Sequence, residues 1–173
     1  ELLIKSDTFC MLPWQHIHAF PDGRAYPCCF SLDKYPVGNL NKDSMETVFN
    51  GPAMKQMRLN MLANKQSRQC TKCYDQEKSG FFSLRLSSNK HFGHNIGMIE
   101  NTQADGSADF VIKYWDIRFS NLCNLACRSC GTWFSSNWYE DHKKLTGKPP
   151  EHAKIMRVGR SSNDIWEQML EQF

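Results

Sequence analysis

The sequence has no long apolar run and no large excess of charge of one sign. Its 173 residues include 21 Lys and Arg against 18 Asp and Glu, which gives a formal net charge of +3. This balance is too mild to predict binding to nucleic acid or to an anionic membrane surface. No apolar stretch approaches the roughly 20 residues that span a bilayer, and none has the form of a signal peptide. We therefore expect no membrane insertion and no nucleic-acid partner.

Repeats and low-complexity tracts are also missing, and most of the composition is ordinary. Hydrophobic residues make up 40% of the chain and charged residues 23%, which suits one domain of usual size or two small ones. Cysteine is the exception, with eight residues. A secreted disulfide scaffold is one interpretation, but seven of the eight cysteines fall into metal-ligand spacings. Because thiolates must stay reduced to hold a metal, we expect a cytoplasmic protein.

Three cysteines stand close together after an apolar segment. Cys123, Cys127 and Cys130 form the run Cys-Asn-Leu-Ala-Cys-Arg-Ser-Cys, and the preceding residues 110–119 predict a buried parallel strand. Three thiolates at this spacing can hold three irons of a [4Fe–4S] cluster and leave the fourth iron without a protein ligand. An iron with an open position can bind a small molecule and pass it an electron, so the spacing predicts a reaction. A zinc site or unligated thiols are the alternatives.

The spacing Cys-x3-Cys-x2-Cys after a strand resembles the signature of the radical S-adenosylmethionine (radical SAM) superfamily. The resemblance implies that the open iron chelates S-adenosylmethionine, whose reductive cleavage yields methionine and a 5′-deoxyadenosyl radical that abstracts a hydrogen atom from the substrate. It also implies a reductant such as flavodoxin or ferredoxin. Where the family usually has an aromatic residue, this chain has Ser129. By the same resemblance, the backbone of this residue contacts the adenine of the cofactor.

A second group of cysteines lies upstream. Cys10 is followed by twelve residues and Gly23, then by four residues and Cys28, and the pair Cys70 and Cys73 comes later. This pattern resembles the first half of a SPASM domain, or the shorter twitch form that carries a single auxiliary cluster. The later cysteines of a full SPASM domain are not present. Four thiolates nevertheless suffice to hold a [4Fe–4S] cluster.

The upstream spacing also makes geometric sense from the residues alone. Residues 14–20 and 24–30 predict two short strands, joined by the turn Pro21-Asp22-Gly23, in which Pro presets φ and Gly accepts a positive φ. The hairpin brings Cys28 back toward the start of the first strand. Tetrahedral zinc is the alternative to an iron–sulfur cluster here, and the neighbouring Cys29 is the alternative to Cys28 as ligand.

We expect an α/β fold in two parts. Residues 1–88 are predicted to form a small α+β metal-binding module, residues 89–109 a linker, and residues 110–173 the start of a partial (β/α)6 radical SAM barrel. A full eight-unit barrel takes about 250 residues, and the Gly-Gly-Glu-type motif of the family does not occur. The resemblance therefore implies the N-terminal portion of a longer enzyme.

Periodicity and capping signals predict helices between these features. Asp43 and Glu46 suggest a capping box for a helix that ends at Phe49. Pro52 opens the next helix. Helical spacing predicts a core-facing set of Met54, Met57, Met61 and Leu62. Further helices are predicted over 74–88 and 133–145, and loops over 31–41 and 151–163.

Four residues near the cysteines admit two roles each. His16 and His18 alternate on the first predicted strand, where they either contact a cluster or pack within the strand. Arg118 and Asn121 flank the three-cysteine run and either donate hydrogen bonds to a bound group or hold the loop in place. We expect a radical SAM enzyme, an oxidoreductase acting on a peptide or small-molecule substrate. The alternative is a non-catalytic iron–sulfur or zinc module that contacts a partner protein.

Overall fold

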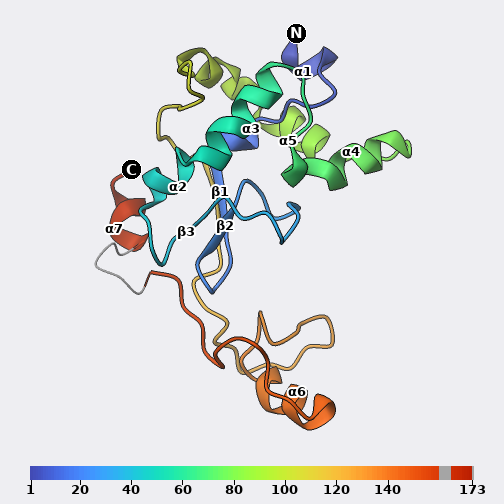
Figure 1. The fold of residues 1–173 in the computed structure, drawn as a ribbon, viewed down its shortest axis with the longest axis vertical. Coiled ribbons are helices and arrows are strands. Elements are labelled where there is room, and N and C mark those ends of the chain that lie inside the picture. The colour runs from blue at the N-terminus through green and yellow to red at the C-terminus, as the bar shows by residue number, and fades with distance from the viewer. Residues whose placement is uncertain (160–164, 173) are drawn as a thin grey trace.

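The fold is built around a small mixed sheet, which a computed structural model describes together with the rest of residues 1–159 and 165–172 (Figure 1). Within these residues the sheet has four strands in the order β3-β2-β1-β4. The strands are β1 (His16–Ala19), β2 (Arg24–Tyr26), β3 (Gly38–Asn39) and β4 (Tyr114–Ile117). The β1–β2 and β2–β3 pairs are antiparallel, whereas β4 is parallel to β1. One sheet therefore joins the hairpin of the upstream cysteines to the strand that enters the three-cysteine loop.

The predicted hairpin is confirmed, although its strands are shorter than expected. His18 pairs with Tyr26 across the two strands. Gly23 closes the turn with φ of +86°, and its N–H donates to the Phe20 carbonyl at 2.9 Å. A Cβ atom at Gly23 would lie 2.5 Å from the side-chain oxygen of Asn39 on β3. Only glycine fits this turn without strain, for reasons of both φ and space.

The two faces of the sheet differ in chemistry. Ile17 on β1 and Ala25 on β2 point into the hydrophobic core, which α2 (Met45–Phe49) and α3 (Pro52–Leu62) complete. Met54, Met57 and Met61 are buried there as predicted, but Leu62 is 36% exposed, so its predicted place in the core is wrong. The opposite face carries the polar and aromatic side chains of the same strands, because neighbouring strand residues point to opposite sides.

Several helix boundaries differ from the predictions. The remaining helices are α1 (Leu2–Lys5), α4 (Thr71–Lys78), α5 (Leu84–Phe92), α6 (Trp138–Thr146) and α7 (Ile165–Leu170), with 3₁₀ turns at Leu12–Trp14, Arg68–Cys70 and Gly93–Asn101. The predicted helix over 74–88 is divided into α4 and α5, because Gly80 takes φ of +81° and Ser83 caps the start of α5. The cap of α2 is Ser44, whose hydroxyl accepts the Thr47 N–H at 3.1 Å, and not Asp43.

The chain between these elements also departs from expectation. β3 lies within the segment 31–41 that was predicted as a loop. Part of the predicted linker 89–109 is helical, in the end of α5 and the 3₁₀ turns that follow it. Of the predicted loop over 151–163, residues 160–163 lie outside the described residues.

The segment 110–119 is not the buried strand that its apolar composition predicts. β4 spans only four of its residues and stands at the edge of the described sheet. Tyr114 is 41% exposed and Phe119 36% exposed as a result. β4, the three-cysteine loop and α6 follow one another in the order of a β/α unit, and closure into a barrel stays a prediction. None of the helices in the described ranges combines the length and apolar character that a membrane crossing needs.

Candidate metal centres

Four of the cysteines that the sequence singles out come together in space. Cys10 precedes the first 3₁₀ turn, Cys28 follows β2, and Cys70 and Cys73 stand where the second 3₁₀ turn meets α4. The Cys70 thiol interacts electrostatically with the other three. Cys10 and Cys73 are 7% and 6% exposed, and Cys28 and Cys70 pack against the core. All are free thiols, so this arrangement of four sulfurs remains available to a metal.

Burial disfavours the charged thiolate form of these cysteines when no metal is bound. It raises the pKa of Cys28 to about 12 and the pKa values of Cys10, Cys70 and Cys73 above their ordinary value. The neighbouring thiols add to this effect, since several negative sulfurs side by side repel each other. A metal group that replaces the protons supplies the missing positive charge, so the site is better suited to a bound metal than to bare thiolates.

Hydrogen-bond donors surround the same sulfurs. The backbone at Leu12 lowers the pKa of Cys10 by hydrogen bonding, and the backbone at Phe30 and Ser31 does the same for Cys28. Cys73 receives such a bond from the Arg85 backbone. Donors of this kind stabilise metal-bound thiolate and orient it. A donor set made only of sulfur suits an iron–sulfur cluster or zinc.

Zinc and a four-iron cluster need different spacings between their sulfur ligands. A tetrahedral zinc with Zn–S bonds of about 2.3 Å holds its ligands close together. In the part of the chain that the structure describes, no three His, Cys, Asp or Glu side chains lie close enough to hold one metal ion. The corners of a four-iron cage lie further apart than the ligands of one ion.

Cys29 does not join this group. Its side chain is exposed, and the charged groups that affect its pKa are those of Asp116, Arg118 and Lys72. Cys28 and Cys29 lie in the bend and turn that follow β2. The structure thus places Cys28, and not Cys29, beside the other three sulfurs.

The three-cysteine loop lies beyond the tip of the hairpin, away from α3, α4 and α5 (Figure 1). Cys127 is exposed, while Cys123 and Cys130 are half-buried. The Cys130 N–H donates to the Cys127 carbonyl at 3.0 Å, and the Trp138 indole donates to the same carbonyl at 3.0 Å. Ser129 is exposed on the same turn. The first residue of α6 therefore holds the backbone of this loop on one side.

Asn121 has the structural role of the two that its position allowed. It is fully buried, and its amide nitrogen donates to the carbonyls of Thr132 and Lys154, each at 3.1 Å. Its oxygen accepts the Met156 N–H at 2.8 Å. These bonds join both ends of the loop to the segment that follows α6. Asn121 thus fixes the backbone conformation of the loop through buried hydrogen bonds.

Arg118 fastens the same loop to the hairpin. Its guanidinium lies 4.4 Å from the Phe134 ring centroid and 5.8 Å from that of Phe20. Arg118 therefore belongs to an aromatic contact between the hairpin and the segment after Cys130.

His16 and His18 link β1 to β4 and do not point at the sulfurs. His16 Nδ1–H donates to the Tyr114 carbonyl at 2.8 Å, and His18 Nδ1 is 2.8 Å from the Asp116 carboxylate. Burial lowers the pKa of His16 to about 4, and it also lowers the pKa of His18. Both imidazoles are neutral at pH 7, and their part is to hold the two strands together.

Sequence comparison agrees with the geometry of the upstream site. Residues 10–74 match the family model of SPASM, an iron–sulfur cluster-binding domain. The matched range includes all four converging cysteines and excludes the three-cysteine loop. No curated protein and no solved structure matches the chain. The SPASM match supports iron–sulfur binding by these residues and an association with radical SAM proteins, in which this domain occurs.

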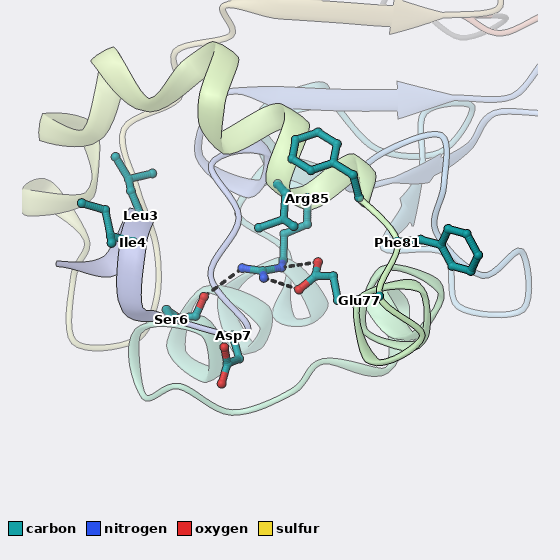
Figure 2. Close-up of a pocket in the computed structure, with 10 residues that line it drawn as sticks. Leu3, Ile4, Ser6, Asp7, Glu77, Phe81 and Arg85 are labelled. Atoms are coloured by element: carbon teal, nitrogen blue, oxygen red, sulfur yellow. Dashed lines mark hydrogen bonds and ion pairs between the residues drawn. The ribbon is translucent and has the colours of Figure 1, made fainter.

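One feature beside the four converging cysteines has no strong signal in the sequence. Arg85 and Glu77 form an ion pair in the wall of a pocket of about 440 Å³ (Figure 2). Arg85 is 4% exposed, and its guanidinium also donates to the carbonyls of Ser6 and Phe9 at 3.0 and 2.9 Å. It ties α4, α5 and the chain before Cys10 together. This role of Arg85 follows from its burial in the fold and is not marked by a motif in the sequence.

Proposed function

We propose that Cys10, Cys28, Cys70 and Cys73 hold an auxiliary [4Fe–4S] cluster. The observation that carries this proposal is the convergence of four free thiols, two buried and two half-buried, within a region that matches SPASM; backbone donors approach three of them. A cluster at this site would supply a place to store one electron or to anchor a substrate.

Metal analysis tests the site directly. Anaerobically purified full-length protein is expected to contain iron and sulfide with the brown absorbance of a cluster. Cys28→Ala should lose the iron of one cluster, whereas Cys29→Ala, a change of the same size one residue away, should keep it. Stoichiometric zinc without iron would reverse the assignment of the metal. Equal iron loss in both variants would contradict the assignment of the ligand.

We further propose that Cys123, Cys127 and Cys130 hold a second cluster with one open iron, and that the protein is a radical SAM enzyme. The exposed loop leaves Cys127 accessible, and Asn121 fixes the backbone from which the sulfurs project. By the family resemblance, the backbone of Ser129 would contact the adenine of the cofactor. A cluster there would deliver one electron to S-adenosylmethionine, whose carbon–sulfur bond breaks to give methionine and a 5′-deoxyadenosyl radical.

Product analysis under anaerobic conditions tests the reaction. Full-length protein with S-adenosylmethionine and a reductant, such as reduced flavodoxin or ferredoxin, is expected to release 5′-deoxyadenosine. Cys127→Ala should abolish the release, and Cys29→Ala should retain it. Unchanged S-adenosylmethionine in a verified iron-replete sample would favour the non-catalytic module instead. A cytoplasmic location and a peptide or small-molecule substrate belong to the same proposal.

A further inference from the structure

A smaller pocket lies where the hairpin meets the segment that follows the three-cysteine loop. Its volume is about 220 Å³, and its lining consists of Phe20, Arg24, Asp33, Trp133 and Phe134. Phe20 and Arg24 stand on either side of the hairpin turn, and Asp33 lies in the loop before β3. Trp133 and Phe134 follow closely after Cys130. The pocket therefore joins the element that leads to Cys28 and the loop that carries Cys130.

The walls of this pocket are aromatic. The Phe20 and Phe134 ring centroids are 5.8 Å apart. The Arg24 guanidinium lies 4.7 Å from the Trp133 ring centroid and 5.8 Å from that of Phe20. Such walls attract an apolar or aromatic group. Pockets that take a drug-sized molecule usually measure about 300–1,000 Å³, so this one suits a single side chain rather than a whole cofactor.

Two polar groups complete the pocket, and they are not paired with each other. Arg24 Nε donates to Asp22 at 2.6 Å, and its side chain also hydrogen bonds to the Tyr26 hydroxyl. A guanidinium has five N–H donors, so these contacts leave some of them free. Within the described residues, the Asp33 carboxylate has no hydrogen-bond or ion-pair partner, since only the Asp33 backbone carbonyl accepts a bond, from Tyr26 at 2.7 Å. The lining thus offers a donor, Arg24, whose charge Asp22 balances. It also offers an acceptor, the Asp33 carboxylate, which has no partner among the described residues.

We infer that this pocket binds a large apolar or aromatic side chain of an amide-linked substrate, with Phe as the preferred type. The aromatic walls take the side chain, Arg24 donates to a carbonyl oxygen, and Asp33 accepts an amide N–H. An amide group carries both partners and no net charge, which fits a lining in which Arg24 is already balanced by Asp22. The inference rests on the proposed function, because it makes the pocket the substrate subsite beside the three-cysteine loop.

Binding of short blocked peptides tests the inference without any turnover. The probes are acetyl-Gly-Phe-Gly-amide, acetyl-Gly-Ala-Gly-amide and acetyl-Phe-amide, titrated into iron-replete full-length protein and followed by NMR of the peptide. The Phe peptide is expected to bind at least tenfold more tightly than the Ala peptide. If acetyl-Phe-amide binds as well as the Phe peptide, the ligand is a single residue derivative. If it binds more weakly, the flanking amides contribute and the ligand is a peptide.

Matched variants identify the pocket. Arg24→Met and Asp33→Leu, which roughly preserve side-chain size and remove the polar group, should each weaken binding of the Phe peptide by about five- to tenfold. Lys90→Met is the control, because Lys90 is exposed on α5 and does not line the pocket, and it should leave binding unchanged. Asp33 is exposed, so its variant keeps the test valid even if the Arg24 variant fails to fold.

The outcomes separate this inference from the proposed reaction. Equal binding of the Phe and Ala peptides, or an effect of Lys90→Met as large as that of Asp33→Leu, would overturn the pocket assignment even if 5′-deoxyadenosine is released. Selective binding of the Phe peptide without release of 5′-deoxyadenosine would leave the pocket in place and overturn the reaction.

Discussion

Acidification should weaken the attachment of β4 to β1 through His16. This imidazole is 1% exposed, and burial lowers its pKa from 6.5 to about 4, although the Tyr114 carbonyl and the Asp116 carboxylate partly offset that effect. A folded-state pKa below the unfolded value gives stability that is present above pH 6.5 and is lost as the pH falls toward 4. Between pH 7 and pH 4.5, these two pKa values predict a loss of about 2 kcal/mol in the free energy of unfolding.

Urea denaturation of wild type and His16→Phe at a series of pH values measures this loss. The Phe ring can keep the stacking on Tyr114, whose ring centroid is 4.4 Å away, but it loses the hydrogen bond to the Tyr114 carbonyl, at a cost of about 1 kcal/mol. The variant should therefore be less stable than wild type at pH 7 and more stable at pH 4.5. His94→Phe is the control, because the exposed His94 also contacts a backbone carbonyl, at 3.1 Å. An equal decline in stability for wild type and His16→Phe would refute the reasoning.

Three further predictions concern stability and are measured by the same denaturation assay. Gly23→Ala should lower the free energy of unfolding by about 1–3 kcal/mol, because the new Cβ meets an oxygen at 2.5 Å. Gly80→Ala should lower it less, because nothing lies within 4 Å of its Cβ position. Equal losses would show that φ alone matters. Met61→Ala should lower the free energy of unfolding by about 2–5 kcal/mol, since this side chain is fully buried. Leu145→Ala, at an 80% exposed position, should change it by less than about 0.5 kcal/mol. A small effect of Met61→Ala would place Met61 outside the core. Glu77→Ala should cost about 3 kcal/mol because it leaves a buried arginine without its acidic partner, and a stability equal to wild type would exclude that role for the ion pair.

Local signals in the sequence predicted the features that depend on neighbouring residues. The hairpin follows from Pro21-Asp22-Gly23 and is present in the structure. The helix that begins at Pro52 and the burial of Met57 follow from capping and periodicity. Each of these depends on contacts within a few residues, where turn chemistry and helical spacing are informative.

Features that depend on distant contacts escaped prediction. The segment around β4 has the composition of a buried strand, yet its place at the sheet edge depends on what pairs with it. The helix over 74–88 is interrupted because Gly80 and Ser83 end and restart it, a change that hydrophobic periodicity does not register. Asn121 was a candidate for contact with a bound group, and only the burial of its amide shows that it serves the backbone.

The parallel pairing of β4 with β1 has a consequence for dissecting this protein. Expression of residues 1–109 alone would leave the hairpin with an open hydrogen-bonding edge, along which a second copy can add a strand. Expression of the remainder alone would leave β4 with nothing to lie against. The two cysteine groups therefore depend on one continuous sheet. Each fragment should aggregate more readily than the intact chain.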